Sequence, residues 1–168
     1  IFATNMDDDH ASYRELILKL EKRFGRKIAP FQVPIRENEK FVGFVNVVKM
    51  KGRRFNADGS YTDDEVRDYS VDYLEQYREA LMEAVAETSE ELLDKFLMGE
   101  EFTPEEIILG VSQGVKDGSI CPVFCGDAHN TFAIDQFLNS LTWLAPSAAV
   151  KAEEIAVDLD GEPVEISV

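Results

Sequence analysis

Long hydrophobic runs, basic residues and cysteines are all scarce in this sequence. No apolar run approaches the ~20 residues that a membrane-spanning helix needs, so we expect no membrane partner. Acidic residues outnumber basic ones by 33 to 17, which gives a net charge of −16. Because the electric field of such a negative charge repels phosphate backbones, we also expect no direct binding of nucleic acid by this chain. A basic protein partner is compatible with the charge but is not required by it.

The only two cysteines, Cys121 and Cys125, limit the redox chemistry of the chain. Both lie in a predicted strand, where residues four positions apart have Cα atoms ~13 Å apart, well beyond disulfide reach. Together with His10 and His129 they match no common zinc-ligand spacing. We therefore expect free, buried thiols in a reducing, cytoplasmic compartment and no metal site.

The sequence also lacks a phosphate-binding loop. The string G-x-x-x-x-G-K-[ST], which supplies backbone N–H groups, a lysine and a magnesium-binding hydroxyl, does not occur. The residues from Asp158 to Gly161 match the short Asp-x-x-Gly magnesium pattern, but four-residue matches are common and we treat this one as a coincidence. A chain without a phosphate loop is not expected to hydrolyse a nucleoside triphosphate by itself.

Two strand–loop–helix units lie at opposite ends of a long middle segment. Residues 1–4 predict a strand, and after an acidic loop residues 11–24 predict a helix that ends at Gly25. Residues 120–125 predict a second strand, and an amphipathic segment follows at 131–144. Doubly wound α/β sheets place ligands beyond the carboxyl ends of such strands. The two units therefore predict parts of one nucleotide site with a segment inserted between them.

The middle segment mixes strand and helix patterns. Pro30 and Pro34 disfavour helix in its first part, and helix-capping residues recur in its second part. The predicted elements are an extended segment at 28–35, an antiparallel hairpin of 41–50 with 51–55, and helices from 64 or 66 to 87, after Ser89, and from Thr103-Pro104 to Gly118. From 150 onward the chain is acidic and alternating, with a predicted turn at Asp160-Gly161. Since the chain starts at Ile1 inside an apolar strand, we expect an excerpt from a larger protein.

Several stretches resemble bacterial elongation factor G, in collinear order over nearly the whole chain. They are 29–35 (APFQVPI), 41–45 (FVGFV), 77–88 (YREALMEAVAET), 91–101 (ELLDKFLMGEE), 121–128 (CPVFCGDA) and 141–146 (LTWLAP). The resemblance implies an α/β fold with a partial P-loop GTPase parallel sheet and an inserted α/β subdomain. The implied parts are GTPase-domain residues 1–26 and 119–146, an insertion at 27–118, and a linker at 147–168 that leads into the next β domain.

The same resemblance implies a translational GTPase that drives translocation on the ribosome. Magnesium would be held by parts of the protein outside this chain. We therefore expect GTP or GDP in the complete protein and no nucleotide on this chain alone. Two alternatives stay open: a non-catalytic protein-binding module with a degenerate nucleotide site, and a GTPase of the ribosome-protection type.

The first guanine-reading loop of that family, Asn-Lys-x-Asp, corresponds to residues 4–7. Guanine presents a ring N–H and an exocyclic amine side by side, and one carboxylate accepts hydrogen bonds from both. The resemblance assigns this role to Asp7, whose other interpretation is a turn or helix N-terminal residue. Thr4 is shorter than the asparagine that ties the family's loop to its surroundings, and Asn5 lacks the lysine stem that covers the base.

The second guanine-reading loop, Gly-Ser-Ala in the family, corresponds to Gly126-Asp127-Ala128. The resemblance implies that the Ala128 N–H meets the base oxygen. Asp127 places a negative charge where serine is usual, and it is equally well interpreted as a turn or N-cap residue. His129-Asn130-Thr131-Phe132 replaces a run that usually bears lysine, so we expect guanine affinity to be weakened or altered.

One helix of the middle segment carries a row of acids. Its apolar positions share one face, and Asp72 and the glutamates fall on the opposite face. Like charges at i, i+4 cost a few tenths of a kcal/mol per pair, roughly, so the helix alone gains nothing from them. A solvated face is one explanation. The resemblance implies another, the docking of a lysine-rich surface of the ribosomal stalk protein. We call Glu75, Glu79, Glu83 and Glu87 the glutamate row.

Overall fold

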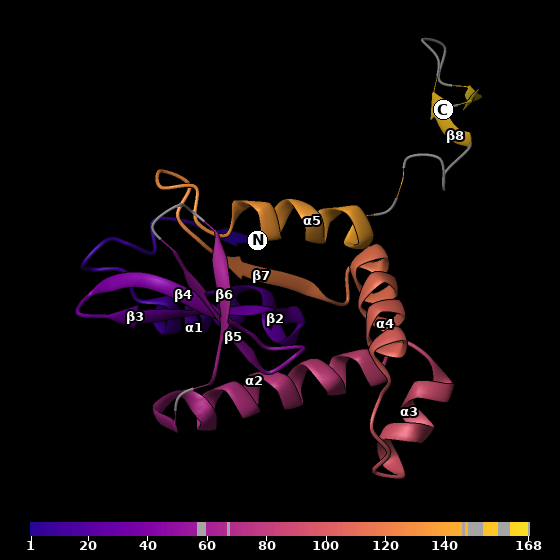
Figure 1. Ribbon diagram of the computed structural model, residues 1–168. Helices are drawn as coiled ribbons and strands as arrows, with labels where there is room; N and C mark the ends of the chain where they lie inside the picture. The colour runs from indigo at the N-terminus through magenta and orange to yellow at the C-terminus, as the bar shows by residue number, and fades with distance from the viewer. Residues whose placement is uncertain (57–59, 67, 146, 148–152, 158–161, 168) are drawn as a thin grey trace.

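The computed structural model describes residues 1–56, 60–66, 68–145, 147, 153–157 and 162–167 (Figure 1). The predicted turn at Asp160-Gly161 and the Asp-x-x-Gly string lie outside these residues, as does the side chain of Asp72. Within them, five α-helices surround two larger sheets, which makes the fold α/β as the sequence predicts. In Figure 1, α5 (Ile134–Leu144) runs above the sheets and α2 (Asp68–Ala86) runs below them.

A parallel sheet joins segments from both ends of the sequence. Its order is β1 (Phe2–Ala3), β7 (Cys121–Cys125) and β2 (Ile28–Pro30). Four of the five residues of the central strand β7 are buried, as its apolar sequence predicts. β2 belongs to the range 27–118 that the sequence assigned to the insertion, and its pairing with β7 makes it a strand of the parallel sheet.

An antiparallel sheet follows directly along the chain. Its order is β3 (Gln32–Glu37), β4 (Lys40–Asn46), β5 (Lys51–Phe55) and β6 (Tyr61–Asp64). The predicted hairpin of β4 with β5 is confirmed. The sequence did not predict β6. Arg54 ties the sheet together, because its guanidinium lies 2.9 Å from Glu37 on β3 and 3.1 Å from Asp64 on β6.

Side-chain caps define most of the helix starts. Ser12 caps α1 (Tyr13–Phe24), Ser89 caps α3 (Glu90–Leu97), and Thr103 forms a capping box with Glu106 at the start of α4 (Pro104–Asp117). A 3₁₀ turn, η1 (Gly25–Lys27), follows α1. The predicted start of the last helix at Thr131 was wrong. Thr131 and Ala133 adopt left-handed φ values of 61° and 63°, which end any helix there, so α5 begins at Ile134.

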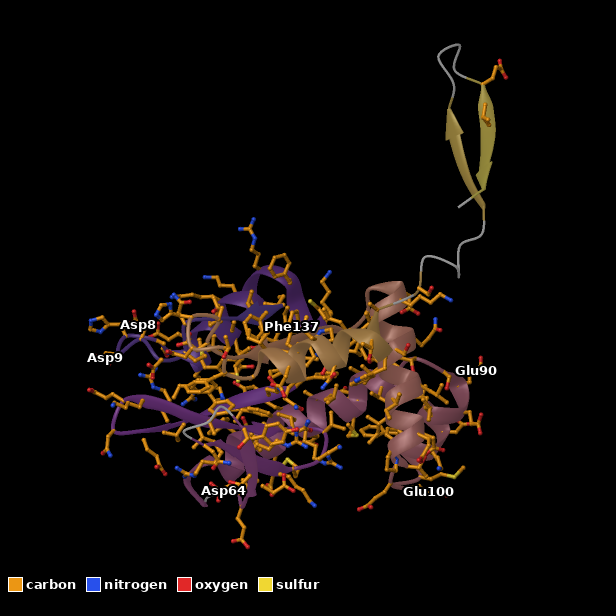
Figure 2. The ribbon with its side chains drawn as sticks, turned by 45° about the horizontal axis from the view of Figure 1, so that its top comes forward. Asp8, Asp9, Asp64, Glu90, Glu100 and Phe137 are labelled. Carbon is orange, nitrogen blue, oxygen red and sulfur yellow. The ribbon has the colours of Figure 1, made fainter. Side chains whose placement is uncertain are left out.

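The apolar core is shared between the parallel strands and the inserted residues. One cluster joins Ala3 and Ile17 with Phe44 and Leu74, and the other joins Phe124 with residues of α2 and α4. On α5, the Phe137 ring lies 4.8 Å from that of Phe2, measured between centroids (Figure 2). The labelled acids in Figure 2 lie at the periphery, with Asp8 and Asp9 at one end and Glu90 and Glu100 at the other.

The last described strands, β8 (Glu153–Val157) and β9 (Pro163–Ser167), pair as an antiparallel hairpin. The sequence predicted a linker into a β domain over this range, and the hairpin is the β structure that it contains. Among the described residues, no helix combines the length and the apolar character needed to cross a membrane.

Candidate functional site: the loops after β1 and β7

The two loops that the sequence singled out lie side by side. β1 and β7 are parallel neighbours, so the segments that follow them leave the same edge of the sheet. The Met6 N–H donates to the Gly126 carbonyl at 3.2 Å, and the Gly126 N–H donates to the Ala3 carbonyl at 2.9 Å. A Cβ at Gly126 would lie 2.6 Å from the Phe132 carbonyl oxygen and 2.7 Å from the Phe2 ring, so this close approach requires glycine. We call residues 4–7 the first loop and 126–128 the second loop.

Thr4 links the first loop to the second. Its Oγ1 accepts a hydrogen bond from the Ala128 N–H at 3.2 Å, across 124 positions of sequence, and donates to the Asn5 side-chain oxygen at 3.1 Å. The short threonine therefore ties the loops to each other, although the sequence comparison had marked it as a departure. The consequence is that the Ala128 N–H, the expected donor to a base oxygen, is already engaged.

Asp7 is exposed at the junction of the first loop with the antiparallel sheet. Its Oδ1 accepts a hydrogen bond from the Phe41 N–H on β4 at 3.2 Å. A carboxylate offers about four lone-pair positions, so this one bond leaves room for further donors. The geometry keeps Asp7 chemically able to accept two N–H groups from a base edge.

Asp127 is directed into its own loop. It is 4% exposed, and its Oδ1 accepts from the backbone N–H groups of His129 at 2.8 Å and Asn130 at 3.1 Å. Its Oδ2 accepts from the Asn130 side-chain amide at 3.2 Å. These bonds match the turn interpretation, since an aspartate commonly binds backbone N–H groups two or three residues on. The charge of Asp127 is thus used to shape the loop.

A hollow of about 360 Å³ opens between Asp7 and the antiparallel sheet. Both loop regions contribute to its wall, the first through Asp7 and the second through Asn130 and Phe132, which follow Ala128. The sheet contributes the remaining residues, among them Lys40, Phe41 and Phe55. We call this space the Asp7 hollow.

Three of the residues that line the Asp7 hollow are phenylalanines whose rings pack against one another. The Phe55 and Phe132 rings stack with centroids 4.5 Å apart and planes 8° apart, and Phe41 meets Phe55 edge-on at 5.2 Å. Of the six residues that the sequence assigned to base recognition, Asp7 alone appears among the residues that line this hollow. Sequence reasoning missed its sheet residues, whose only local signal is a phenylalanine-rich strand pattern.

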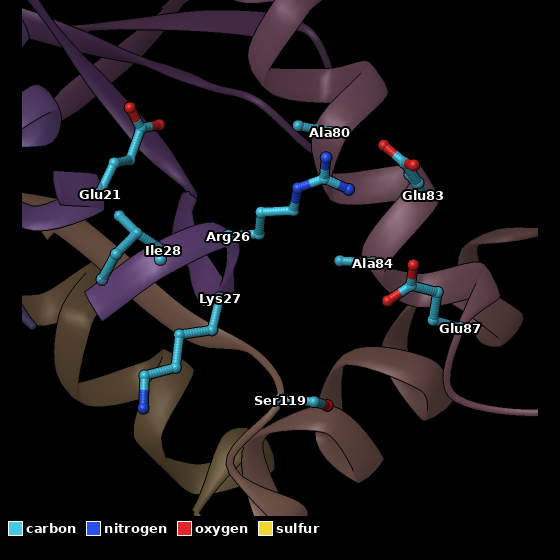
Figure 3. Close-up of a pocket in the computed structure, with 10 residues that line it drawn as sticks. Glu21, Arg26, Lys27, Ile28, Ala80, Glu83, Ala84, Glu87 and Ser119 are labelled. Carbon is cyan, nitrogen blue, oxygen red and sulfur yellow. The ribbon is translucent and has the colours of Figure 1, made fainter. Parts of the chain in front are cut away.

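Glu75, Glu79 and Glu83 of the glutamate row are exposed on α2, and Glu87 is exposed just beyond the last residue of that helix. The opposite face carries the buried side chains of Leu74, Leu81 and Val85. Glu83 and Glu87 line a groove of about 420 Å³ whose other wall includes Arg26 and Lys27 (Figure 3). Figure 3 shows the Arg26 side chain extending toward α2, whereas Lys27 points away from it. One half of the row therefore lies across the groove from a basic side chain of the chain itself, Arg26.

Burial shifts the pKa of two titratable groups in the core, Cys125 and Tyr13. Cys121 and Cys125 are both free, and complete burial raises the pKa of the Cys125 thiol. Burial also raises the pKa of Tyr13, whose hydroxyl is buried without a hydrogen-bond partner among the described residues. Within the same residues, no group of three or more His, Cys, Asp or Glu side chains is arranged to hold a metal ion.

No protein-family model matches the chain. Its structure resembles the crystal structure of ttk003000868 from Thermus thermophilus, with a TM-score of 0.81 and 26% sequence identity. The matched region covers 94% of this chain and 25% of that protein, so the chain spans about a quarter of its length. The match supports the α/β fold over nearly all of the chain.

Proposed function

We propose that this chain is part of an elongation-factor-G-like translational GTPase of the cytoplasm and carries its guanine-reading loops. The observation that carries the proposal is the junction of the first and second loops, where Thr4 binds Ala128 beside an exposed Asp7. Residues so far apart in sequence meet at the carboxyl ends of adjacent parallel strands, where α/β folds place their ligands. GTP or GDP would be bound by the complete protein.

Asp7 is the base-reading residue in this proposal. Its carboxylate accepts the N1–H and the 2-amino group of guanine, while adenine offers no such pair of donors at that edge. Phosphate and magnesium contacts must come from elsewhere, because the chain contains no phosphate-loop string. On this proposal the chain contributes base selectivity and no hydrolysis of its own.

A substitution that swaps acceptors for donors tests this role. In Asp7→Asn, an amide N–H faces the base, so guanosine should lose affinity by about tenfold. Xanthosine, which has a carbonyl in place of the 2-amino group, should bind this variant with higher affinity than it binds the wild type. Both affinities are measured on the 168-residue chain by ¹⁵N-edited NMR titration with millimolar nucleosides, because without phosphate contacts the chain alone is not expected to retain a nucleotide at lower concentrations. Asp8→Asn, the neighbouring exposed aspartate, is the matched control; equal guanosine affinity in wild type and Asp7→Asn would contradict the assignment.

The glutamate row supports a second part of the proposal, the docking of a lysine-rich surface of the ribosomal stalk protein. Three exposed carboxylates follow one another along α2, and the fourth lies just after its end. Because exposed charges mainly change the rate at which two proteins encounter each other, we expect the row to raise the association rate in a salt-dependent way.

One observation favours a different function, a protein-binding module with a degenerate nucleotide site. The Ala128 N–H donates to Thr4 Oγ1 and the Asp127 N–H donates to the Phe132 carbonyl, so neither residue presents a free backbone donor to a base. Under this alternative the docking surface persists and guanosine does not bind. The nucleoside titration separates the two functions.

A further inference from the structure

We propose that Lys40, on the inserted antiparallel sheet, is a base-binding residue that donates a hydrogen bond to guanine O6 in the Asp7 hollow. This inference rests on the proposed function, since it assigns one more contact to the same base. It makes the inserted sheet a wall of the nucleoside site. The ligand class is a 6-oxopurine nucleoside.

The geometry places Lys40 at the same cavity as Asp7. Both residues line the Asp7 hollow, and the backbone of the next residue, Phe41, already donates to the Asp7 carboxylate at 3.2 Å. Phe55 and Phe132, whose rings stack on each other, also line the hollow, so part of its wall is apolar. An acid, a lysine and two aromatic residues from four segments of the chain therefore line one hollow.

The base chemistry requires a donor that the second loop does not offer. When Asp7 accepts the N1–H and the 2-amino group of guanine, the adjacent O6 is left as an acceptor without a partner. The Ala128 N–H is engaged by Thr4 Oγ1 at 3.2 Å. Leaving a desolvated acceptor unpaired is costly, so a binding site for guanine needs another donor near Asp7.

Lys40 has uncommitted donors, whereas the Arg54 guanidinium is held in place by two carboxylates. Lys40 is exposed, and within the described part of the chain no hydrogen bond or ion pair engages its ammonium group, which carries three N–H donors. Arg54 also lines the hollow, but its guanidinium is held by Glu37 and Asp64. Lysine is an established partner of guanine O6 in nucleic-acid recognition, and the same donor–acceptor chemistry applies to a free nucleoside.

The test compares guanosine with 6-thioguanosine, in which a weakly accepting sulfur replaces O6 while the donors to Asp7 remain. Binding to the 168-residue chain is followed by ¹⁵N-edited NMR. The wild type should prefer guanosine, and Lys40→Met should lower guanosine affinity by about tenfold and abolish the preference. Lys40→Arg, which keeps a donor, should retain the preference for guanosine over 6-thioguanosine. Lys49→Met, at an exposed lysine just beyond the other end of β4, should behave as wild type.

The outcomes separate this inference from the function on which it rests. If wild type binds guanosine through Asp7 and Lys40→Met keeps both the affinity and the preference over 6-thioguanosine, the Lys40 assignment is overturned and the proposed function stands. If wild type binds no guanosine, both fall. If Lys40→Met and Lys40→Arg lose the preference equally, O6 donation by Lys40 is also rejected.

Discussion

At the scale of single residues, Tyr13 shows where the fold carries an uncompensated polar group. Its side chain is 7% exposed, and its hydroxyl finds no hydrogen-bond partner among the described residues. Burial raises its pKa, with smaller contributions from Cys125, Tyr77 and Tyr73. A buried hydroxyl without a partner costs about 1–3 kcal/mol, whereas a phenyl ring of the same shape does not.

Replacing Tyr13 with phenylalanine should therefore raise the free energy of unfolding by about 1 kcal/mol. Urea denaturation at neutral pH measures this change in the free energy of unfolding. The control is Tyr61→Phe, which removes a hydroxyl that accepts a hydrogen bond from Gln136 at 3.0 Å and should lower stability slightly. A loss of stability in Tyr13→Phe comparable to that control would show that the Tyr13 hydroxyl has a partner.

At the scale of elements, local chemistry predicted the helices better than the strands. Ser89 and Thr103 identified helix starts because each cap is a contact within three residues of sequence, whereas the cap at Ser12 was missed and that helix was started at residue 11. β6 was missed because its residues are mostly exposed, and it is held to β5 by charge pairs such as Arg53 with Asp63. No local pattern encodes that pairing.

The Thr103 capping box gives the element-scale prediction. The Thr103 hydroxyl accepts from the Glu106 N–H at 3.2 Å, and the Glu106 carboxylate accepts from the Thr103 N–H at 2.8 Å. Thr103→Ala should lower the free energy of unfolding by about 1 kcal/mol because a helix N–H loses its acceptor. Thr142→Ala, at an exposed threonine on α5, should change it by less than about 0.5 kcal/mol in the same urea experiment. Equal effects would show that the box does not stabilise α4.

Some residues of the candidate site could likewise be predicted from the sequence, and others only from contacts in the structure. Asp7, Thr4 and the second loop were predicted because they follow strands whose order a family resemblance supplied. Lys40 was not predicted, because it lines the hollow from a separate sheet and its proposed role depends on the bond between Phe41 and Asp7. The engagement of Ala128 by Thr4 likewise follows from three-dimensional contact alone.

At the scale of the whole molecule, the inserted sheet and the first loop are coupled. Arg36 on β3 donates to the Ala11 carbonyl at 3.0 Å and to the Asp8 carbonyl at 2.9 Å, close to the bond from Phe41 to Asp7. The two hydrophobic clusters also combine inserted residues with the parallel strands. The site is therefore supported from both sides, and a change in the insertion reaches the loops directly.

Charge distribution gives the whole-molecule prediction for the glutamate row. Reversing Glu75 and Glu79 to lysine should slow association with a lysine-rich stalk domain by about tenfold at low salt. The matched pair Glu83→Lys with Glu87→Lys should have a smaller effect, because Arg26 lies across the groove from those charges and extends toward α2. The effects of both double substitutions are measured as association rates at two ionic strengths. Unchanged rates in the Glu75→Lys with Glu79→Lys variant would show that the glutamate row is a solvated face without a docking role.

The most direct measurement is a titration of the unmodified ¹⁵N-labelled chain with guanosine and, separately, with adenosine. Guanosine should shift the amide signals of both loops together, including those of Asp7 and Ala128, and adenosine should not. Equal shifts with the two nucleosides, or no shifts at these loops at millimolar guanosine, would contradict the claim that the joined loops read a guanine base.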